Sequence, residues 1–223
     1  MKSVTINRSQ QLKDDPGTGH NRWHPDIEPI LEAAPGEEVV LETRDASDGQ
    51  TGPGVLNPKP GKGIHPLTGP VFVQGAEPGD LLEIEYLDII PQSYGWTRAR
   101  PDAGFLRGVI DNPILVNWEL RDGWATAPEV PGVFIPAGPF MGTAGLAPSH
   151  AQITEWTRRE TDLVERGGSA QLPDPQDAVP SSEPIASEGL RTAPPRENGG
   201  NFDIKQLTRG SKLLVPVTVR GGL

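Results

Sequence analysis

The sequence predicts a mainly β fold, a β-sandwich of short strands joined by glycine- and proline-rich loops, with one or two short helices. Two observations lead to this prediction. The 223 residues include 27 glycines and 25 prolines, about twice ordinary usage, and both residue types end or weaken helices. The clearest apolar patterns have a period of two, which is the period of a strand with one buried face. A helical bundle or coiled coil is therefore excluded, and we expect residues 1–223 to form a single unit.

The expected strands are short apolar or alternating runs that follow turns rich in glycine and proline. They lie at residues 37–43, 71–74, 82–86, 114–118, 133–135 and 213–219. The third of these runs is the clearest, because Leu82, Ile84 and Tyr86 alternate with glutamates. Pro216 cannot donate a ladder hydrogen bond, so it places the last strand at a sheet edge or at a bulge.

One helix is expected over residues 150–166. Ser149 is a suitable N-cap, Ile153 and Trp156 share one face, and Gly167 follows the last turn. The next segment, residues 169–195, is rich in proline, serine and aspartate and has no periodicity. It is either a disordered linker or a long ordered loop that wraps over the fold.

Composition excludes several classes of function. Thirty acidic against 20 basic residues give a net charge of −10, which disfavours nucleic-acid binding. No apolar run reaches the ~20 residues of a membrane span. The absence of cysteine excludes disulfides and thiol nucleophiles. The chain carries no phosphate-binding loop, serine elbow or His-Glu-x-x-His motif. We therefore expect a soluble cytoplasmic protein that acts on a small molecule and uses no nucleotide or organic cofactor.

Two N-terminal polar clusters have the residue types of a functional site. His20 and His24 are four residues apart, which on a helix would make a metal pair. Pro25 biases His24 toward extended geometry, so a loop that places a histidine and Trp23 beside a pocket is favoured. In the second cluster Asp45 follows an expected strand, where it either forms a catalytic or metal site or caps its own turn.

Three later segments carry further candidates. His65 precedes a proline and is either a turn residue or a site residue. Residues 139–148 are rich in small residues, which suit an oxyanion hole or a tight connection between elements. Residues 196–203 read Arg-Glu-Asn-Gly-Gly-Asn-Phe-Asp. They form either a bent backbone that presents oxygen ligands and proton-transfer groups or a polar turn.

Taken in order, these segments resemble the acetamidase/formamidase family. The matching stretches are HNRWHPD (20–26), LETRDASDGQ (41–50), HPLTGPVFVQGAEPGDLLEIEYLDI (65–89), GFLR (104–107), PFMGTAGLAPS (139–149) and PPRENGGNFDIKQLTRGSKLLVPVTV (194–219). The resemblance implies a jelly-roll-like sandwich, assembly into homo-oligomers, and hydrolysis of formamide or acetamide to ammonia and a carboxylate. The alternatives are a γ-lactam or carbamate hydrolase, or a noncatalytic β subunit that another chain completes.

On this interpretation a divalent metal ion, with zinc as a candidate, activates water and polarises the amide carbonyl. The expected metal ligands are Asp45, Asp203 and His65. Glu197 would be the general acid or base, together with Asn198. The residues expected to line the substrate pocket are His20, Trp23, Phe140 and Gly142.

The chain departs from the family pattern at its C-terminal end. Family members continue with a segment that carries a Gly-Asp-x-His…Gly-Asp-Gly-Glu pattern. We expect a second polypeptide to supply this segment, or the chain to be a processed or truncated fragment.

Overall fold

The computed structural model describes residues 1–52 and 61–223. These residues are mainly β, as predicted, and their strands pair into one four-stranded sheet and six two-stranded sheets. The parallel pairs are β1 (Lys2–Val4) with β5 (Val39–Leu41) and β4 (Leu31–Ala33) with β7 (Val71–Val73). The antiparallel pairs are β2 (Gly19–His20) with β6 (Leu67–Thr68), β3 (Arg22–Trp23) with β14 (Leu190–Arg191), β8 (Leu81–Glu85) with β16 (Lys212–Pro216), and β13 (Thr143–Gly145) with β15 (Gly199–Asn201).

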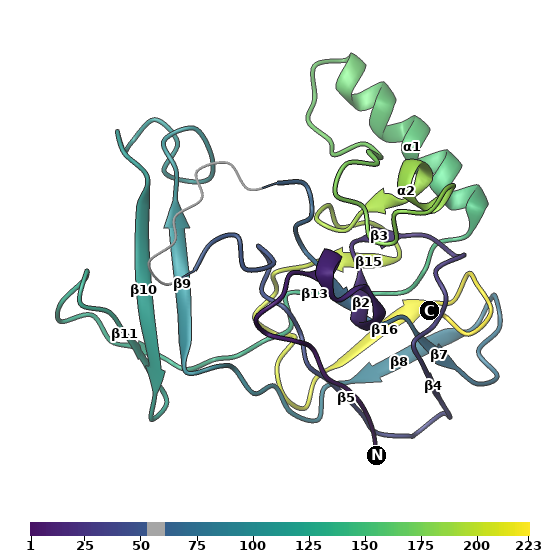
Figure 1. Cartoon of the computed structure of the whole chain (residues 1–223), viewed down its shortest axis with the longest axis horizontal. Coiled ribbons are helices and arrows are strands. Elements are labelled where there is room, and N and C mark those ends of the chain that lie inside the picture. Colours follow the sequence, from purple (N-terminus) through teal and green to yellow (C-terminus); the bar gives the residue numbers. More distant parts are fainter. Residues whose placement is uncertain (53–60) are drawn as a thin grey trace.

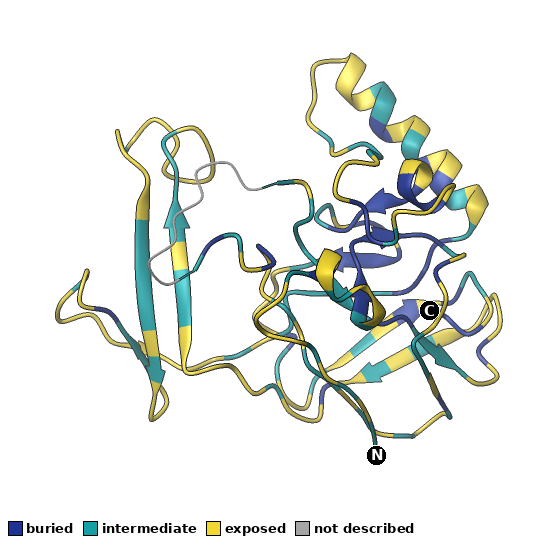
Figure 2. Cartoon of the chain, viewed as in Figure 1, coloured by how far each residue is buried: buried dark blue, intermediate teal, exposed yellow. Residues whose placement is uncertain are grey.

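The four-stranded sheet stands to one side of the other elements (Figure 1). Its strands are β9 (Tyr94–Ala99), β10 (Ile114–Arg121), β11 (Trp124–Thr126) and β12 (Ile135–Pro136), in the order β12-β11-β10-β9. We call residues 94–136 the arm and the other described residues the body. The buried residues gather in the body, whereas the arm is largely exposed or intermediate (Figure 2).

Two apolar clusters form the core of the body. The first joins Trp23, Ile153, Trp156 and Leu190, which come from β3, the long helix and β14. The second joins Ala76, Leu146, Val215 and Val217, with Leu82 and Ile84 of β8 packed against it. The alternation in β8 therefore has the predicted effect, since Leu82 and Ile84 turn inward while Glu83 and Glu85 stay exposed.

The helix α1 (His150–Glu165) is confirmed with its predicted cap. The Ser149 backbone N–H donates to Gln152 Oε1 at 2.9 Å, and the Ser149 hydroxyl accepts from the Gln152 N–H at 3.3 Å. This reciprocal pair satisfies two of the free donors at the helix start. Gly167 has φ +82°, the left-handed conformation that ends many helices.

The segment from 169 to 195 is an ordered loop, which settles the alternative left open by its composition. It carries α2 (Ile185–Glu188) and β14. The fully buried Arg22 donates from Nη2 to the carbonyl oxygens of Asp174 (2.7 Å) and Gln176 (3.0 Å). These hydrogen bonds from the buried guanidinium of Arg22 therefore hold the loop against β3.

The remaining expectations are met in part. The run at 133–135 forms a strand only at its end, in β12, and Pro216 is the last residue of β16, whose partner is β8. The small sheets do not by themselves define a jelly roll, so the jelly-roll arrangement of the strands stays a prediction. Within the described residues, no helix has the length and apolar character needed to cross a membrane.

Candidate functional site

His20 and Trp23 lie together at the centre of the body. Their rings meet edge-on with centroids 5.9 Å apart. His20 Nδ1 lies 2.6 Å from the carbonyl oxygen of Arg22, so Nδ1 carries the proton and Nε2 keeps its lone pair. Burial lowers the pKa of His20 to about 4. This imidazole is therefore neutral at pH 7.

Asn198 lies against the same tryptophan, where β13 and β15 approach closely. A Cβ on Gly145 would come within 2.5 Å of the Asn198 carbonyl oxygen and 3.1 Å of Trp23 Cη2, so only glycine fits there. Asn198 Nδ2 donates to the Leu146 carbonyl oxygen at 2.7 Å. Asn198 Oδ1 and Trp23 Nε1 are buried without a hydrogen-bond partner among the described residues. Such orphaned groups in a core call for an explanation, and a bound small molecule is one.

His65, Gly142 and Asp203 form a second group. The Gly142 carbonyl oxygen accepts from the Phe202 N–H at 2.8 Å and the Asp203 N–H at 3.2 Å. A Cβ on Gly142 would lie 3.2 Å from Asp203 Oδ1. His65 and Asp203 have φ values of 54° and 50°. This region is sparsely populated by non-glycine residues, and strain of this kind clusters at functional sites.

The electrostatics of His65 connect it to the same group. Burial is the main cause that lowers the pKa of His65, the Asp203 carboxylate opposes that effect, and the Arg191 guanidinium adds to it. The backbone of His65 is held on both sides, since its N–H donates to the Ala46 carbonyl oxygen at 2.8 Å and its carbonyl oxygen accepts from the Thr192 hydroxyl at 2.7 Å. The group thus presents a neutral imidazole, a carboxylate and a guanidinium. Sequence reasoning missed Arg191 and Thr192, which have no motif of their own.

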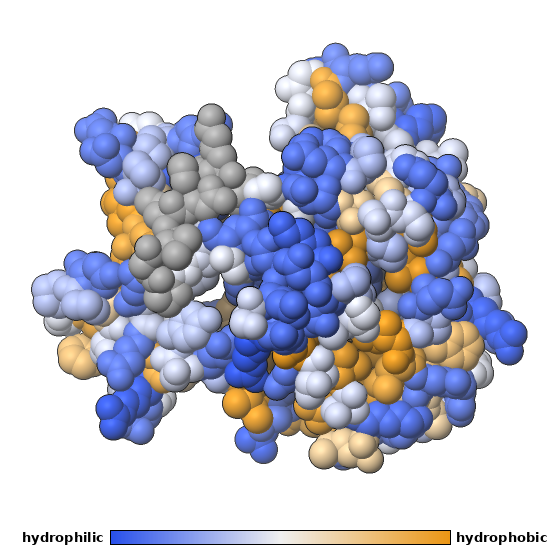
Figure 3. Space-filling view, in the orientation of Figure 1, coloured by the Kyte–Doolittle hydropathy of each residue, from blue (hydrophilic) through white to orange (hydrophobic). Residues whose placement is uncertain are grey.

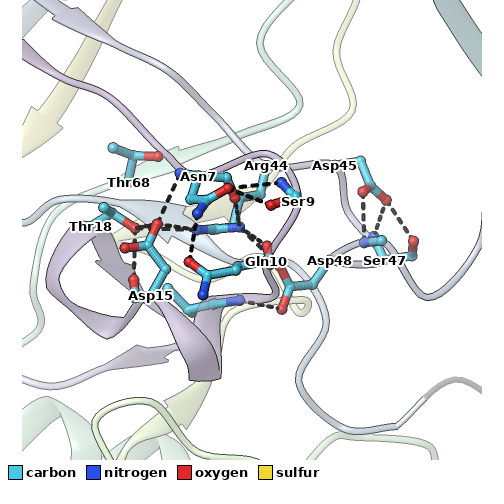
Figure 4. A network of polar contacts seen from close by, with 12 residues as sticks. Asn7, Ser9, Gln10, Asp15, Thr18, Arg44, Asp45, Ser47, Asp48 and Thr68 are labelled. Atoms are coloured by element: carbon cyan, nitrogen blue, oxygen red, sulfur yellow. Dashed lines mark hydrogen bonds and ion pairs between the residues drawn. The ribbon is translucent and has the colours of Figure 1, made fainter.

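The turn interpretation describes the geometry of Asp45 (Figure 4). Its Oδ1 accepts from the Ser47 N–H (2.8 Å) and hydroxyl (2.6 Å), and its Oδ2 accepts from the Gly49 N–H at 2.8 Å. The buried carboxylate of this loop is that of Asp48, whose Oδ2 accepts from the Leu12 N–H at 2.8 Å. Burial raises the pKa of Asp48.

Glu197 and Phe140 are exposed and lie outside these two groups. Both oxygens of the Glu197 carboxylate accept from Arg159 of α1, the Oε2 contact being 3.0 Å. Arg159 holds the pKa of Glu197 below its usual range, so this carboxylate is charged at neutral pH, and its role as general acid or base stays a prediction. Phe140 forms an isolated bridge with Thr208 and is 38% exposed.

Among the residues that the structure describes, two surface hollows are not lined by His65 or Asp203. The smaller one, of about 100 Å³, is bordered by Asn21, Asp48, Gln50 and Asp177 among others. The larger one, of about 470 Å³, lies over β4 and β7 near Phe72 and Arg220. The smaller hollow is bordered by residues of two motifs, 20–26 and 41–50, but neither hollow is lined by His65 or Asp203.

A metal-ligating group that the sequence did not predict is formed by His24, Asp26 and His150. Each offers one ligand atom, and the three atoms lie within 4.8 Å of one another. This group could hold a metal ion. His24 thus pairs with Asp26 and His150 rather than with His20. Only the His-Pro-Asp spacing gave a local signal, since His150 is 124 positions from Asp26.

The fold and site define a mainly β protein with buried histidine, tryptophan and asparagine side chains, and with a half-buried histidine whose electrostatics involve an exposed aspartate. The chain belongs to the Acetamidase/Formamidase family, which it matches over residues 5–223. It is 35% identical to an acetamidase of Mycolicibacterium smegmatis over 98% of the chain. It is 33% identical to a formamidase of Methylophilus methylotrophus over 100% of the chain.

A solved structure agrees with this assignment. The γ-lactamase from Delftia acidovorans covers 100% of the chain with a TM-score of 0.88 and 32% sequence identity. The chain spans 61% and 60% of the length of the two curated relatives and 60% of the γ-lactamase chain.

Proposed function

We propose that this protein hydrolyses a short carboxamide, formamide or acetamide, to a carboxylate and ammonia. The observation that carries the proposal is membership of the acetamidase/formamidase family over residues 5–223, and the partly buried His65, on which the charges of Asp203 and Arg191 act, supports it. Because the matched relatives are longer than this chain, the proposal concerns the whole protein. Its homo-oligomeric assembly, and completion of the site by a further polypeptide, belong to the same proposal.

Hydrolysis of an amide needs a base for water, a stabiliser for the carbonyl oxygen, and a proton for the leaving nitrogen. We assign the base to His65, which takes a proton from water as the oxygen bonds to the carbonyl carbon. Asp203 stabilises the imidazolium that forms, and Arg191 favours the negative charge that develops on the carbonyl oxygen. The imidazolium then returns its proton to nitrogen as the C–N bond breaks, so ammonia leaves and His65 is neutral again.

The divalent ion implied by the family resemblance does not fit Asp45, His65 and Asp203 as they stand. The oxygens of Asp45 already accept three hydrogen bonds within its own turn. Among the residues the structure describes, these three do not bring their ligand atoms within 4.8 Å of one another. We therefore derive no step through a metal at these residues.

The test is an assay of ammonia release from formamide and acetamide by the native protein, with His65→Asn as the variant. Loss of a general base lowers kcat by roughly 10²- to 10⁴-fold. Asp203→Asn should lower kcat less, because it removes only the stabiliser of the imidazolium. Asp162→Asn, an exposed carboxylate change on α1, is the matched control. Full activity of His65→Asn would overturn the assignment.

A γ-lactam is the second candidate substrate, favoured by the likeness to the γ-lactamase structure at a TM-score of 0.88. Ring opening of a γ-lactam creates a primary amine on the product and releases no ammonia. Parallel assays for amine and ammonia with a five-membered lactam and with formamide therefore separate the two activities.

A further inference from the structure

We propose that His24, Asp26 and His150 bind a divalent transition-metal ion of the zinc class, at a site separate from His65 and Asp203. Two imidazoles and one carboxylate are a ligand set that suits zinc, cobalt or nickel better than magnesium or calcium, which take oxygen ligands. The ion would tie the segment after β3 to the first residue of α1. This inference does not depend on the proposed amide hydrolysis.

The distances already approach those of a metal site. His150 Nε2 lies 3.2 Å from Asp26 Oδ1, and His24 Nδ1 lies 3.8 Å from Asp26 Oδ2. Zinc–ligand bonds of about 2.1 Å in a tetrahedron place neighbouring ligand atoms roughly 3.4 Å apart. The two histidine rings are nearly perpendicular, with centroids 5.2 Å apart. Small rotations of Asp26 and His150 would bring the atoms to coordination distance, and both side chains are exposed enough to move.

His24 is the fixed member of the set. Its side chain is 0% exposed, and Nδ1 is the ring nitrogen that lies toward the Asp26 carboxylate. Its Nδ1 accepts from the Asp26 N–H at 3.2 Å, at the long end of the hydrogen-bond range.

Some charges around the cluster oppose a bound cation and others favour it. The α1 N-terminus opposes a positive ion because the helix dipole is positive there. Asp26 supplies one negative charge, and Glu188 of α2 is near enough to act on His24. With three protein ligands the ion would keep one position open to water, since His150 and Asp26 face solvent.

The test is titration of the full chain with Co²⁺ followed by visible absorption, and competition with Zn²⁺. We compare the wild type with His150→Ala and Asp26→Asn, two exposed positions where the variants should fold normally. Each variant should lower affinity at least about tenfold, because loss of even an outer-sphere partner costs 10- to 100-fold. Glu155→Gln, which removes an exposed charge from the same helix, should bind as the wild type does.

Amide hydrogen exchange provides a second readout that an ion bound elsewhere would not change. Zn²⁺ should slow exchange in the first turn of α1 of the wild type and leave that turn of His150→Ala unaffected. The proposal is overturned if the wild type shows no saturable Co²⁺ spectrum, or if both variants bind with wild-type affinity.

Discussion

The arm and the body use the same backbone hydrogen bonding but bury very different side chains. In the body, Leu190 and Trp156 are 0% and 3% exposed, and even the charged Arg22 is 0% exposed. In the arm, Phe105 and Phe134 are 108% and 66% exposed, and Ala127 is its one buried hydrophobic residue. The space-filling view shows the arm as a separate lobe (Figure 3).

This difference shows that a hydrogen-bonded ladder is not enough to make a stable unit. The arm has four paired strands, but it lacks the buried apolar area that provides the main favourable term in folding. The body has that buried apolar area, and its interior also contains buried histidines, arginines and Asn198. We infer that the stability of the chain resides in the body, and the following predictions test this from the largest effect to the smallest.

The largest effect is expected where the body buries charge. Arg196 donates to both oxygens of Glu160, at 2.6 and 2.8 Å, and its side chain is 1% exposed. Arg196→Met leaves Glu160 buried and unpaired, which should lower the free energy of unfolding by about 3–5 kcal/mol. The equivalent change in the arm, Arg100→Met, breaks an exposed pair with Asp102 and should cost less than about 1 kcal/mol.

Urea unfolding of the two variants measures this contrast. A double variant, Arg196→Met with Glu160→Leu, should recover most of the loss because it leaves no unpaired charge. Equal losses for Arg196→Met and Arg100→Met would contradict the division between body and arm.

A nearly equal loss is expected when the apolar core of the body is cut. Trp156 packs with Trp23, Ile153 and Leu190, so Trp156→Ala should lower the free energy of unfolding by about 3–5 kcal/mol. Trp124→Ala in the arm, where that ring is 49% exposed, is the matched control and should cost much less. Thermal or urea unfolding of both proteins gives the comparison, and a larger loss for Trp124→Ala would reverse it.

The features predicted correctly from sequence are the local ones. The N-cap Ser149 determines the start of α1, and the alternation of Leu82 and Ile84 determines which face of β8 is buried. The strand β9 was not predicted, because Tyr94–Ala99 mixes aromatic, glycine and charged residues. Its conformation depends on the register with β10, which no local pattern reveals.

The candidate site shows the same difference between local features, which the sequence predicts, and long-range contacts, which it does not. The structure brings the motif residues His20, Trp23 and Asn198 near one another, and their membership of one functional site stays a prediction. The His24–Asp26–His150 group was not expected, because it depends on α1 docking over β3 through the Trp23–Trp156 core. The spacing of four between His20 and His24 would make a metal pair only on a helix, and the chain between them is not helical, in agreement with the loop that Pro25 favoured.

The third effect is a dependence on pH that arises in the body, which holds all four histidines. Burial lowers the pKa of His20 to about 4 from 6.5. Below pH 6.5 the unfolded chain therefore binds a proton at this histidine that the folded chain does not bind. The free energy of unfolding decreases as pH falls from about 6.5 to 4. Each pKa unit corresponds to about 1.4 kcal/mol, so the full loss is of the order of 3 kcal/mol.

His20→Asn tests this prediction, because asparagine can keep the donor to the Arg22 carbonyl oxygen and does not titrate. Urea unfolding at pH 7 and pH 5 should show a smaller difference for the variant than for the wild type. Part of the slope should remain, since burial also lowers the pKa values of His24 and His65. Identical slopes would show that His20 is not the source.

The smallest effect on stability is expected at the tip of the arm. Phe105 is fully exposed, so Phe105→Ser should change the free energy of unfolding by less than about 0.5 kcal/mol. The arm nevertheless exposes several large apolar side chains, and contiguous exposed apolar surface favours association. Phe105→Ser should therefore reduce self-association in sedimentation velocity while the urea midpoint stays unchanged. A loss above 1 kcal/mol at concentrations where the chain is monomeric would mean that the arm packs on the body, and the comparison between the two regions would fail.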